Sequence, residues 1–502
     1  MEEEAAPLLL LPGGEGEVFV DELKKVSYIA LPMVAVTISQ ILPRVVSMMM
    51  VGHLGELALS GVAVATSLAN VTGLSPLFGM ASALETLCGQ AFGAEQYEKL
   101  GLYTNASILC LLLLCLPLSL LWIFLERLLI FIGQDPSISH EAGHYAIWLI
   151  PGLFGYAILQ ALIRYLQTQS LIVPMVWSSI AALFVHVPVC WVLVFKANLG
   201  TAGAALAIGL CYWFNVILLL LYVNYSSTCK RTRAPFDKSV LSGMREFLRF
   251  AVPSAVMVCL EWWSCEILVL LSGLLPNPQL ETSVLSLCLM IASLHYFIPY
   301  SVGAAASTRV SNELGAGHPE RARASVYAAG FLSIAEAIVA CTFLLSLSNI
   351  VGYAFSNEKE VVDYLRELVP FICLLIAMDC IQAVLSGLAS TPLFVPFSSL
   401  SGRCNIWRNS TRVARGCGWQ HLGAYVNLGA YYLVGLPAAV TLGFVFHWRG
   451  KGLWLGLNMG SIVQSTLLCL VTCSTNWRKQ ASMARQRIFE GTMAPEHEKV
   501  LA

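Results

Sequence analysis

Ala83-Leu-Glu-Thr-Leu-Cys-Gly-Gln-Ala-Phe-Gly-Ala94 aligns without gaps with Ala305-Ala-Ser-Thr-Arg-Val-Ser-Asn-Glu-Leu-Gly-Ala316, which begins 222 residues later. Each stretch follows a long apolar segment and leads through a charged loop into the next apolar segment. The same offset relates Gln160-Ala-Leu162 to Gln382-Ala-Val384. The chain therefore contains two copies of one structural unit.

Apolar segments dominate the rest of the sequence. Of the 502 residues, 57% are hydrophobic and 12% are charged, whereas about 25% are charged in soluble domains. A membrane-spanning helix needs roughly 20 apolar residues. Twelve segments satisfy this requirement, near residues 28–50, 59–83, 103–125, 144–165, 173–195, 200–223, 250–274, 283–306, 324–347, 364–389, 422–446 and 452–474. We expect an all-α integral membrane protein with twelve transmembrane helices.

Two copies of a six-helix unit account for these twelve spans. Because six is even, both copies enter the membrane from the same side, as parallel repeats do. We predict two six-helix lobes, at residues 28–225 and 250–475, with a substrate cavity between them. The other residues are assigned to a disordered tail over 1–27, an inter-lobe linker over 226–249 and a carboxy-terminal tail over 476–502.

The register of the repeat changes within the second copy. Pro188 is expected to match Pro437, and Gly203 to match Gly452, but both pairs are separated by 249 residues. About 27 extra residues therefore lie between the tenth and eleventh spans. Residues 390–414 include two prolines, seven Ser or Thr and three arginines, which is the composition of a linker. We predict that this segment is a largely disordered insertion at the cytoplasmic end of the tenth span.

The basic residues predict the orientation. Of the 29 Lys and Arg, 21 lie on the side of both termini and six on the opposite side. Lys and Arg are retained preferentially in the cytoplasm, so both termini are predicted to be cytoplasmic, in a plasma or vacuolar membrane. The net charge of -1 gives no support for a nucleic-acid partner. The 16 cysteines are scattered, mostly within apolar spans, and indicate buried hydrophobic packing.

Carboxyl groups within apolar spans are the strongest functional candidates. Glu261 lies in the seventh span, in Ala251-Val-Pro-Ser-Ala-Val-Met-Val-Cys-Leu-Glu-Trp-Trp263, and Asp379 lies in the middle of the tenth span. Intramembrane acids are rare, and they usually face a cavity and handle ions or protons. Burial favours the protonated carboxyl, so such a group can take up a proton from one compartment and release it to the other. Glu266 is a further acid of the seventh span, on a different helical face from Glu261.

Other polar residues of the spans are weaker candidates. Glu336 has no polar partner that the sequence reveals, and function and packing are equally compatible with it. Glu85 is expected to make a structural hydrogen bond or to pair with Arg309. Arg44 and Arg164 could contact anions, but extension toward lipid headgroups is the expected role of both.

The spacing of the histidines in the sequence does not indicate a metal site. His144, His186 and His295 do not lie at ligand spacing from another His, Cys or carboxylate. We predict that they pack or line a cavity, and we expect no metal and no cofactor. An intramembrane enzyme would need a paired catalytic constellation, which the spacing does not show.

Amide and aromatic side chains of the spans could line a substrate cavity. Rings suit flat or cationic organic ligands, and amides bind without a full charge. Aromatic residues also form interfacial belts, and amides also join helices. The candidates are Gln40, Trp262, Trp263, Tyr300, Gln382, Tyr425 and Asn427.

Several phrases together resemble the multidrug and toxic compound extrusion (MATE) family, in particular its plant branch of proton-coupled efflux carriers. They are Met50-Val-Gly-His-Leu-Gly-Glu-Leu57, Ala83–Ala94, Leu166-Gln-Thr-Gln-Ser170, Leu260-Glu-Trp-Trp263, Leu271-Ser-Gly-Leu-Leu-Pro-Asn-Pro278, Arg309-Val-Ser-Asn-Glu-Leu-Gly-Ala-Gly317 and Arg415-Gly-Cys-Gly-Trp-Gln420. The resemblance implies a V-shaped cleft between two lobes, alternating access, and export of organic compounds in exchange for protons. It also implies that Glu261 and Asp379 are coupling acids, with Glu266 matching a further family acid.

The sequence departs from the family pattern at two places. Cys288 stands near the position of an eighth-span acid found in animal relatives, so a relay of three carboxylates is not expected. Family members also run directly from the equivalent of Ala389 to that of Arg415, which locates the same insertion as the internal repeat. We expect a monomeric antiporter of small organic solutes with protons as the coupling ion. A sodium-coupled carrier and a variant made inactive by the insertion are the alternatives.

Overall fold

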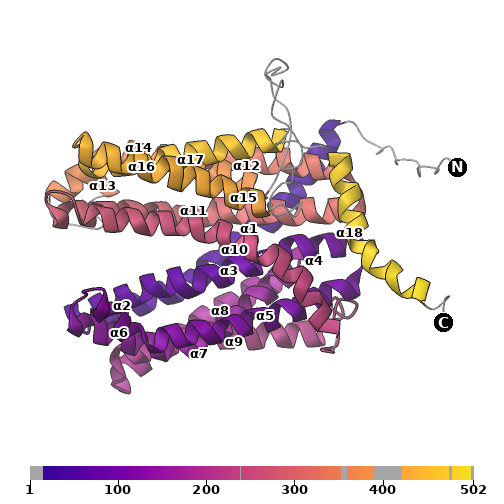
Figure 1. The fold of residues 1–502 in the computed structure, drawn as a ribbon, viewed down its shortest axis with the longest axis horizontal. Coiled ribbons are helices and arrows are strands. Elements are labelled where there is room, and N and C mark those ends of the chain that lie inside the picture. The colour runs from indigo at the N-terminus through magenta and orange to yellow at the C-terminus, as the bar shows by residue number, and fades with distance from the viewer. Residues whose placement is uncertain (1–14, 238, 352–358, 388–419, 474–476, 499–502) are drawn as a thin grey trace, which may run out of the picture.

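The computed structural model describes residues 15–237, 239–351, 359–387, 420–473 and 477–498, and all regular elements within these ranges are helices (Figure 1). The first half contains α1 (Glu15–Gly52), α2 (Glu56–Ala69), η1 (Asn70–Leu74), α3 (Ser75–Ala81), α4 (Ala83–Gly93), α5 (Tyr97–Ile123), α6 (Leu125–Phe131), α7 (Pro136–Thr168), α8 (Ile172–Trp191), η2 (Val192–Lys196) and α9 (Gly200–Tyr225). The second half contains α10 (Ser239–Ser272), α11 (Pro278–Ala316), α12 (Pro319–Ser346), α13 (Ser348–Val351), α14 (Lys359–Gly387), α15 (Gln420–Asn427), η5 (Leu428–Gly435), α16 (Leu436–Val440), η6 (Thr441–Val445), α17 (Arg449–Cys473) and α18 (Trp477–Glu498).

Eleven helical segments of the described chain are long and apolar enough to cross a membrane. Each corresponds to a predicted span, and some join several labelled pieces; the second span runs from Glu56 to Gly93 through the π-turn η1. The tenth predicted span is α14, a 29-residue helix that is charged over its first turns and packs against α11, α12 and α17. The twelve predicted spans are therefore all helical.

The duplicated segments pack against each other at the centre of the molecule. A Cβ atom built on Gly93 would lie 1.9 Å from the backbone oxygen of Asn312, and one on Gly315 would lie 2.2 Å from that of Gln90. These two contacts are equivalent under the 222-residue offset. Helices α4 and α11 therefore cross in direct backbone contact around a pseudo-two-fold axis, which requires glycine at both positions.

A second pair of local structures supports the longer offset of the repeat. The π-turns η2 and η6 end the fifth and eleventh spans, and Val192 and Thr441, where they begin, are 249 residues apart. Gly203 packs on the backbone of the first turn, and Gly452 packs in the same way on the second. This is the separation that the two prolines and glycines predicted.

The described residues form two apolar cores, and the larger one extends into α10, α11, α12 and α18 of the second half. The larger core includes Trp122 and most buried residues of the first half, and the smaller includes Trp454 and residues of α10, α11, α14 and α17. In the ribbon, α2, α3 and α5 to α9 form one layer, while α11, α12, α14, α16 and α17 form the other (Figure 1). The two lobes meet through α1, α4, α10 and α11.

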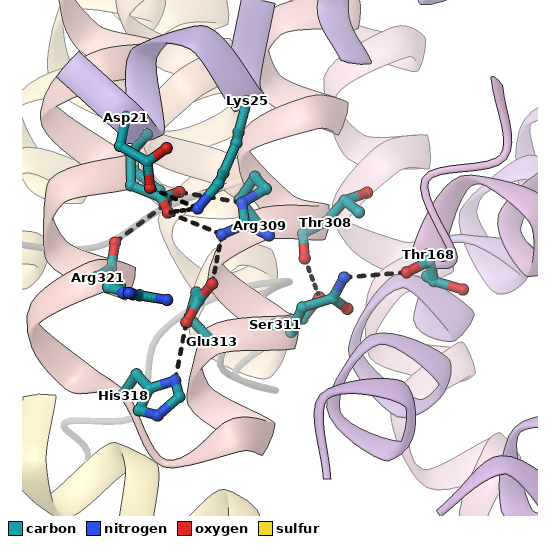
Figure 2. Close-up of polar contacts among 12 residues, drawn as sticks. Asp21, Lys25, Thr168, Thr308, Arg309, Ser311, Glu313, His318 and Arg321 are labelled. Atoms are coloured by element: carbon teal, nitrogen blue, oxygen red, sulfur yellow. Dashed lines mark hydrogen bonds and ion pairs between the residues drawn. The ribbon is translucent and has the colours of Figure 1, made fainter. Parts of the chain in front are cut away.

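The prediction of a disordered tail over 1–27 is wrong for residues 15–27, which extend α1 by three turns. This extension carries Glu22, whose side chain is fully buried and is bound by the Arg309 guanidinium through Nε at 3.0 Å and Nη2 at 2.8 Å. Ser325 of α12 donates a third hydrogen bond at 2.6 Å. Figure 2 shows Arg309 close to Asp21 and Lys25 of the same extension. Arg309 also pairs with Glu313 of its own helix. Burying a carboxylate requires such partners, so the extension is ordered by α11 and α12.

The predicted linker and carboxy-terminal tail are also partly helical. Helix α10 begins at Ser239 rather than near residue 250, and Asp237 accepts a hydrogen bond from the Ser239 backbone N–H at 2.9 Å. The hydrogen bonds from Ser239 hold the pKa of Asp237 below its ordinary value. Residues 477–498 form α18, which packs on α4, α11 and α12. The predicted insertion, 390–414, lies outside the described residues.

Candidate functional site

Glu261 is bound by amide side chains from two other helices. The Gln382 Nε2 of α14 donates to its Oε2 at 3.0 Å, and the Asn427 Nδ2 of α15 approaches the same oxygen at 3.5 Å. Gln382 and Asn427 are both almost fully buried. Glu261, Gln382 and Asn427 were predicted site residues, and the fold brings them together from positions 121 and 166 residues apart.

A chain of hydrogen bonds fixes the orientation of Asn427. Tyr431 OH donates to Gln464 Oε1 at 2.7 Å, so the Gln464 amide nitrogen points to Asn427 Oδ1, at 2.8 Å. The Asn427 amide nitrogen must then face Glu261 and the Met257 carbonyl oxygen, which it reaches at 2.8 Å. Tyr431 belongs to the π-turn η5, a distortion that often marks functional sites. Gln464 and Tyr431 were not predicted, since only tertiary structure places them beside the acid.

Gln382 lacks such a constraint. Its Oε1 is buried and has no hydrogen-bond partner among the described residues. Rotation of the amide by half a turn exchanges its donor and acceptor ends. Gln382 can therefore donate to an ionised Glu261 or accept from a protonated one.

Asp379 lies one turn before Gln382 on α14, so both residues are on the same helix face. Asp379 is partly buried and close enough to Glu261 for the two carboxyl groups to interact electrostatically. The third predicted acid, Glu266, has a different environment, because Ser67 of α2 donates a hydrogen bond to its Oε2 at 2.9 Å. Glu266 therefore links the seventh span to the other lobe.

Two predicted cavity aromatics pack around Phe78 at the contact between the lobes. Trp262 stacks on the Phe78 ring with centroids 5.6 Å apart, and Tyr300 lies at 5.8 Å. The Arg164 guanidinium lies over the same ring, 5.0 Å from its centroid. Trp262 directly follows Glu261 in α10, but consecutive residues of a helix do not face each other.

Arg164 and Glu85 do not behave as predicted. Arg164 Nε lies 3.0 Å from Glu85 Oε1, with both side chains 2% exposed, although their alignment falls short of a hydrogen bond. Arg164 Nη2 also donates to Tyr300 OH at 2.8 Å. The expected extension of Arg164 toward headgroups is thus wrong, as is the pairing of Glu85 with Arg309, which binds Glu22 and Glu313 instead. The buried cation provides a fixed counter-ion for Glu85.

The other cavity candidates vary in exposure. Trp263 is 37% exposed and donates from Nε1 to the Val71 carbonyl oxygen at 3.1 Å. Tyr425 is 71% exposed. Gln40 is partly buried, and its Nε2 has no hydrogen-bond partner among the described residues.

Arg44 faces the interior of the first lobe rather than headgroups. It lines a cavity of about 30 Å³ with Trp122, Tyr145 and Tyr212, and its Nη1 lies 3.4 Å from Asn70 Oδ1. A cavity of this size has room for about two water molecules. It is too small for an organic solute in this conformation.

His295 and Glu336, which had no visible partners in the sequence, contact each other. His295 Nε2 lies 2.6 Å from Glu336 Oε1, and the Cys380 thiol lies 2.9 Å from Glu336 Oε2. His295 was predicted to pack or to line a cavity, and the structure in addition gives it a carboxylate and a thiol as neighbours, which the spacing in the sequence did not indicate.

Two related helical lobes, with a carboxylate and amide site inside one of them, define a membrane transporter. The sequence profile of the MatE family matches residues 32–192 and 253–391, whose starts reproduce the internal repeat to within one residue. The chain belongs to the MatE family. The first matched unit is the longer one, and the second ends beside the predicted insertion.

Plant relatives match nearly the whole chain. Protein DETOXIFICATION 14 of Arabidopsis thaliana is 52% identical over 487 residues, covering 96% of this chain and 95% of that protein. Protein DETOXIFICATION 3 of the same plant is 52% identical over 473 residues, covering 94% of each. The crystal structure of the eukaryotic MATE transporter AtDTX14 aligns with a TM-score of 0.86 at 53% identity, covering 94% of this chain and all of that one. These findings confirm the predicted family and its two-lobed, V-shaped helical fold, and they define a transporter rather than an enzyme.

Proposed function

We propose that this transporter exports organic solutes in exchange for protons, with Glu261 and Asp379 as the coupling acids. The arrangement around Glu261 is the observation that carries the proposal. A coupling acid must be stable in the membrane both with and without its proton, and the rotatable Gln382 amide can satisfy either state. Glu85 provides the contrast, because its neighbour is the buried Arg164 guanidinium, which cannot exchange a donor for an acceptor.

The two acids would act as one unit. Two carboxylates in a region of low dielectric repel each other, so ionising one favours protonation of the other. Binding of a cationic or polar solute near the pair would then favour proton release. Protonation and solute occupancy would compete, and this competition is the basis of exchange.

Alternating access would depend on the contact between the lobes. The α4–α11 crossing and the Glu22–Arg309 contact close the end of the molecule where both termini lie (Figures 1 and 2). The excess of Lys and Arg in the loops at this end predicts that it faces the cytoplasm. The structure would then correspond to a state closed to the cytoplasm. The opposite state would need these contacts to separate.

The chemistry of the lobes suggests the solute class. Trp262, Tyr300 and Phe78 form an aromatic cluster at the contact between the lobes, and aromatic rings suit flat or cationic organic molecules. Relatives named DETOXIFICATION proteins are in accord with export of such compounds. We place the protein as a monomer in a plasma or vacuolar membrane, with the lipid bilayer and a small organic solute as its partners.

Reconstituted protein tests the coupling ion. A panel of plant flavonoids, alkaloids and organic cations would be offered to proteoliposomes carrying a pH gradient, with and without sodium. Proton coupling predicts uptake that needs the pH gradient and persists when sodium is omitted. Uptake that stops without sodium at a fixed pH gradient would identify the sodium-coupled carrier instead.

A further inference from the structure

Three metal-ligand side chains from three different helices converge in the second lobe. His295 comes from α11, Glu336 from α12 and Cys380 from α14, and their ligand atoms all lie within 4.8 Å of one another. Glu336 is central, because its two oxygens separately contact the imidazole at 2.6 Å and the thiol at 2.9 Å. The cluster has no part in the proposed transport site.

The ligand set has a recognisable chemistry. One imidazole nitrogen, one thiolate and one carboxylate suit Zn²⁺ and similar borderline-soft cations such as Cd²⁺ and Co²⁺. Ligand atoms in a tetrahedral zinc site are separated by about 3.5 Å, given bond lengths of about 2.0–2.3 Å. The two contacts of Glu336, at 2.6 Å and 2.9 Å, are shorter than this value by less than 1 Å, and all three ligand atoms lie within 4.8 Å of one another, so binding needs side-chain adjustments of about 1 Å rather than movement of helices.

Charge also favours a divalent cation. A thiolate and a carboxylate carry two negative charges, and together they neutralise the ion. A neutral site avoids the cost of leaving net charge in a membrane interior. On binding, the Cys380 thiol proton leaves to solvent, and the His295 proton moves from Nε2 to Nδ1. That nitrogen has no hydrogen-bond partner among the described residues, so the second tautomer displaces no existing bond.

The cluster is not completely enclosed by protein. The His295 side chain is 11% exposed and that of Glu336 is 16% exposed, while Cys380 is buried behind them. Three protein ligands leave a fourth position open, which solvent can fill.

We propose that His295, Glu336 and Cys380 form a binding site for a divalent cation of the zinc class. Occupancy ties α11, α12 and α14 together through one ion. Cys380 directly follows Asp379 in α14, so the ion restrains the segment that carries this acid.

Cobalt provides a direct probe, because a thiolate bound to Co²⁺ gives a charge-transfer absorption band. The full-length protein, purified in detergent, would be titrated with Co²⁺ and then with Zn²⁺. The proposal predicts a band that saturates at one Co²⁺ per chain and is abolished by stoichiometric Zn²⁺. Absence of a saturable band in the wild-type protein would overturn it.

Matched variants locate the site. Cys380→Ser should remove the band. Glu336→Gln keeps every thiol but should weaken Co²⁺ binding by more than about 100-fold, because loss of a residue that only orients a ligand already lowers metal affinity by about 10–100-fold. Cys373→Ser is the control, because this thiol lies on the same helix and contacts the Cys341 carbonyl oxygen outside the cluster. An unchanged band in Cys380→Ser, or loss of the band in Cys373→Ser, would refute the assignment. Unfolding temperatures of the metal-free variants identify any that fail to fold.

Discussion

Replacement of Arg164 by Met should destabilise the protein strongly, because it leaves Glu85 buried without its cation. Both side chains are 2% exposed, so solvent cannot screen the remaining charge. Removing one partner of a buried ion pair costs about 3–5 kcal/mol. The variant also loses the hydrogen bond to Tyr300 and the contact with the Phe78 ring.

A second substitution should recover much of this loss. In Arg164→Met/Glu85→Gln the uncompensated carboxylate is gone, and replacement of a whole buried pair by neutral groups is often close to neutral. The double-mutant cycle should therefore give a coupling free energy of about 2–3 kcal/mol. The single variant Glu85→Gln should also be destabilised, because it leaves the guanidinium buried without its carboxylate.

The measurement is the unfolding free energy of the purified protein in mixed micelles, titrated with a denaturing detergent and followed by tryptophan fluorescence. The four proteins of the cycle are compared under one set of conditions. If the double variant is as unstable as Arg164→Met alone, the destabilisation comes from lost packing, and the reasoning about charge is wrong.

Three further predictions concern the lobe contact and the insertion. Gly315→Ala should lower the unfolding temperature, because its Cβ would meet the α4 backbone. Gly330→Ala is the control and should leave the unfolding temperature unchanged, because nothing lies within 4 Å of its new Cβ. Equal effects of the two substitutions would contradict the close crossing. Glu22→Gln should lower the unfolding free energy by about 1.5–3 kcal/mol, because it weakens the hydrogen bonds to the charged Arg309. Asp21→Asn, on the exposed side of the same helix, should change it by less than about 0.5 kcal/mol. Unfolding in a denaturing detergent compares the two variants. Deleting residues 390–414 should leave pH-driven uptake in proteoliposomes equal to or higher than that of the full chain, and a complete loss would show that the segment is needed.

The sequence predicted those features that the bilayer imposes. A membrane span must be apolar along its whole length, so the helical segments can be identified from the sequence. Duplication leaves matching residues at a fixed spacing within each part of the repeat, so the two copies can be aligned. The contact of Gly93 and Gly315 with the opposing backbones follows the same symmetry. Glu261 and Asp379 were recognisable because a carboxyl is unusual in such a context, and the fold joins their helices through the hydrogen bond between Gln382 and Glu261.

The partners of buried charges were the main failures. Glu22 lies in a charged amino-terminal stretch that looks solvated, and its contact with Arg309 is made across 287 residues. Glu336 meets His295 of the preceding helix across 41 residues, a separation that no spacing rule connects. A single sequence shows which charges need a partner but not which partner the fold supplies.

The most direct test of the proposed coupling is the pH dependence of solute exchange in Glu261→Gln. Glu281→Gln is the matched control, because Glu281 is a buried acid of the same lobe that accepts hydrogen bonds from Tyr364 and the Gly450 backbone N–H. With the best solute from the uptake panel, Glu261→Gln should lose uptake driven by a pH gradient, and Glu281→Gln should keep it per folded molecule. Uptake by Glu261→Gln at the wild-type rate and with the wild-type pH profile would contradict a role for this carboxyl in proton exchange.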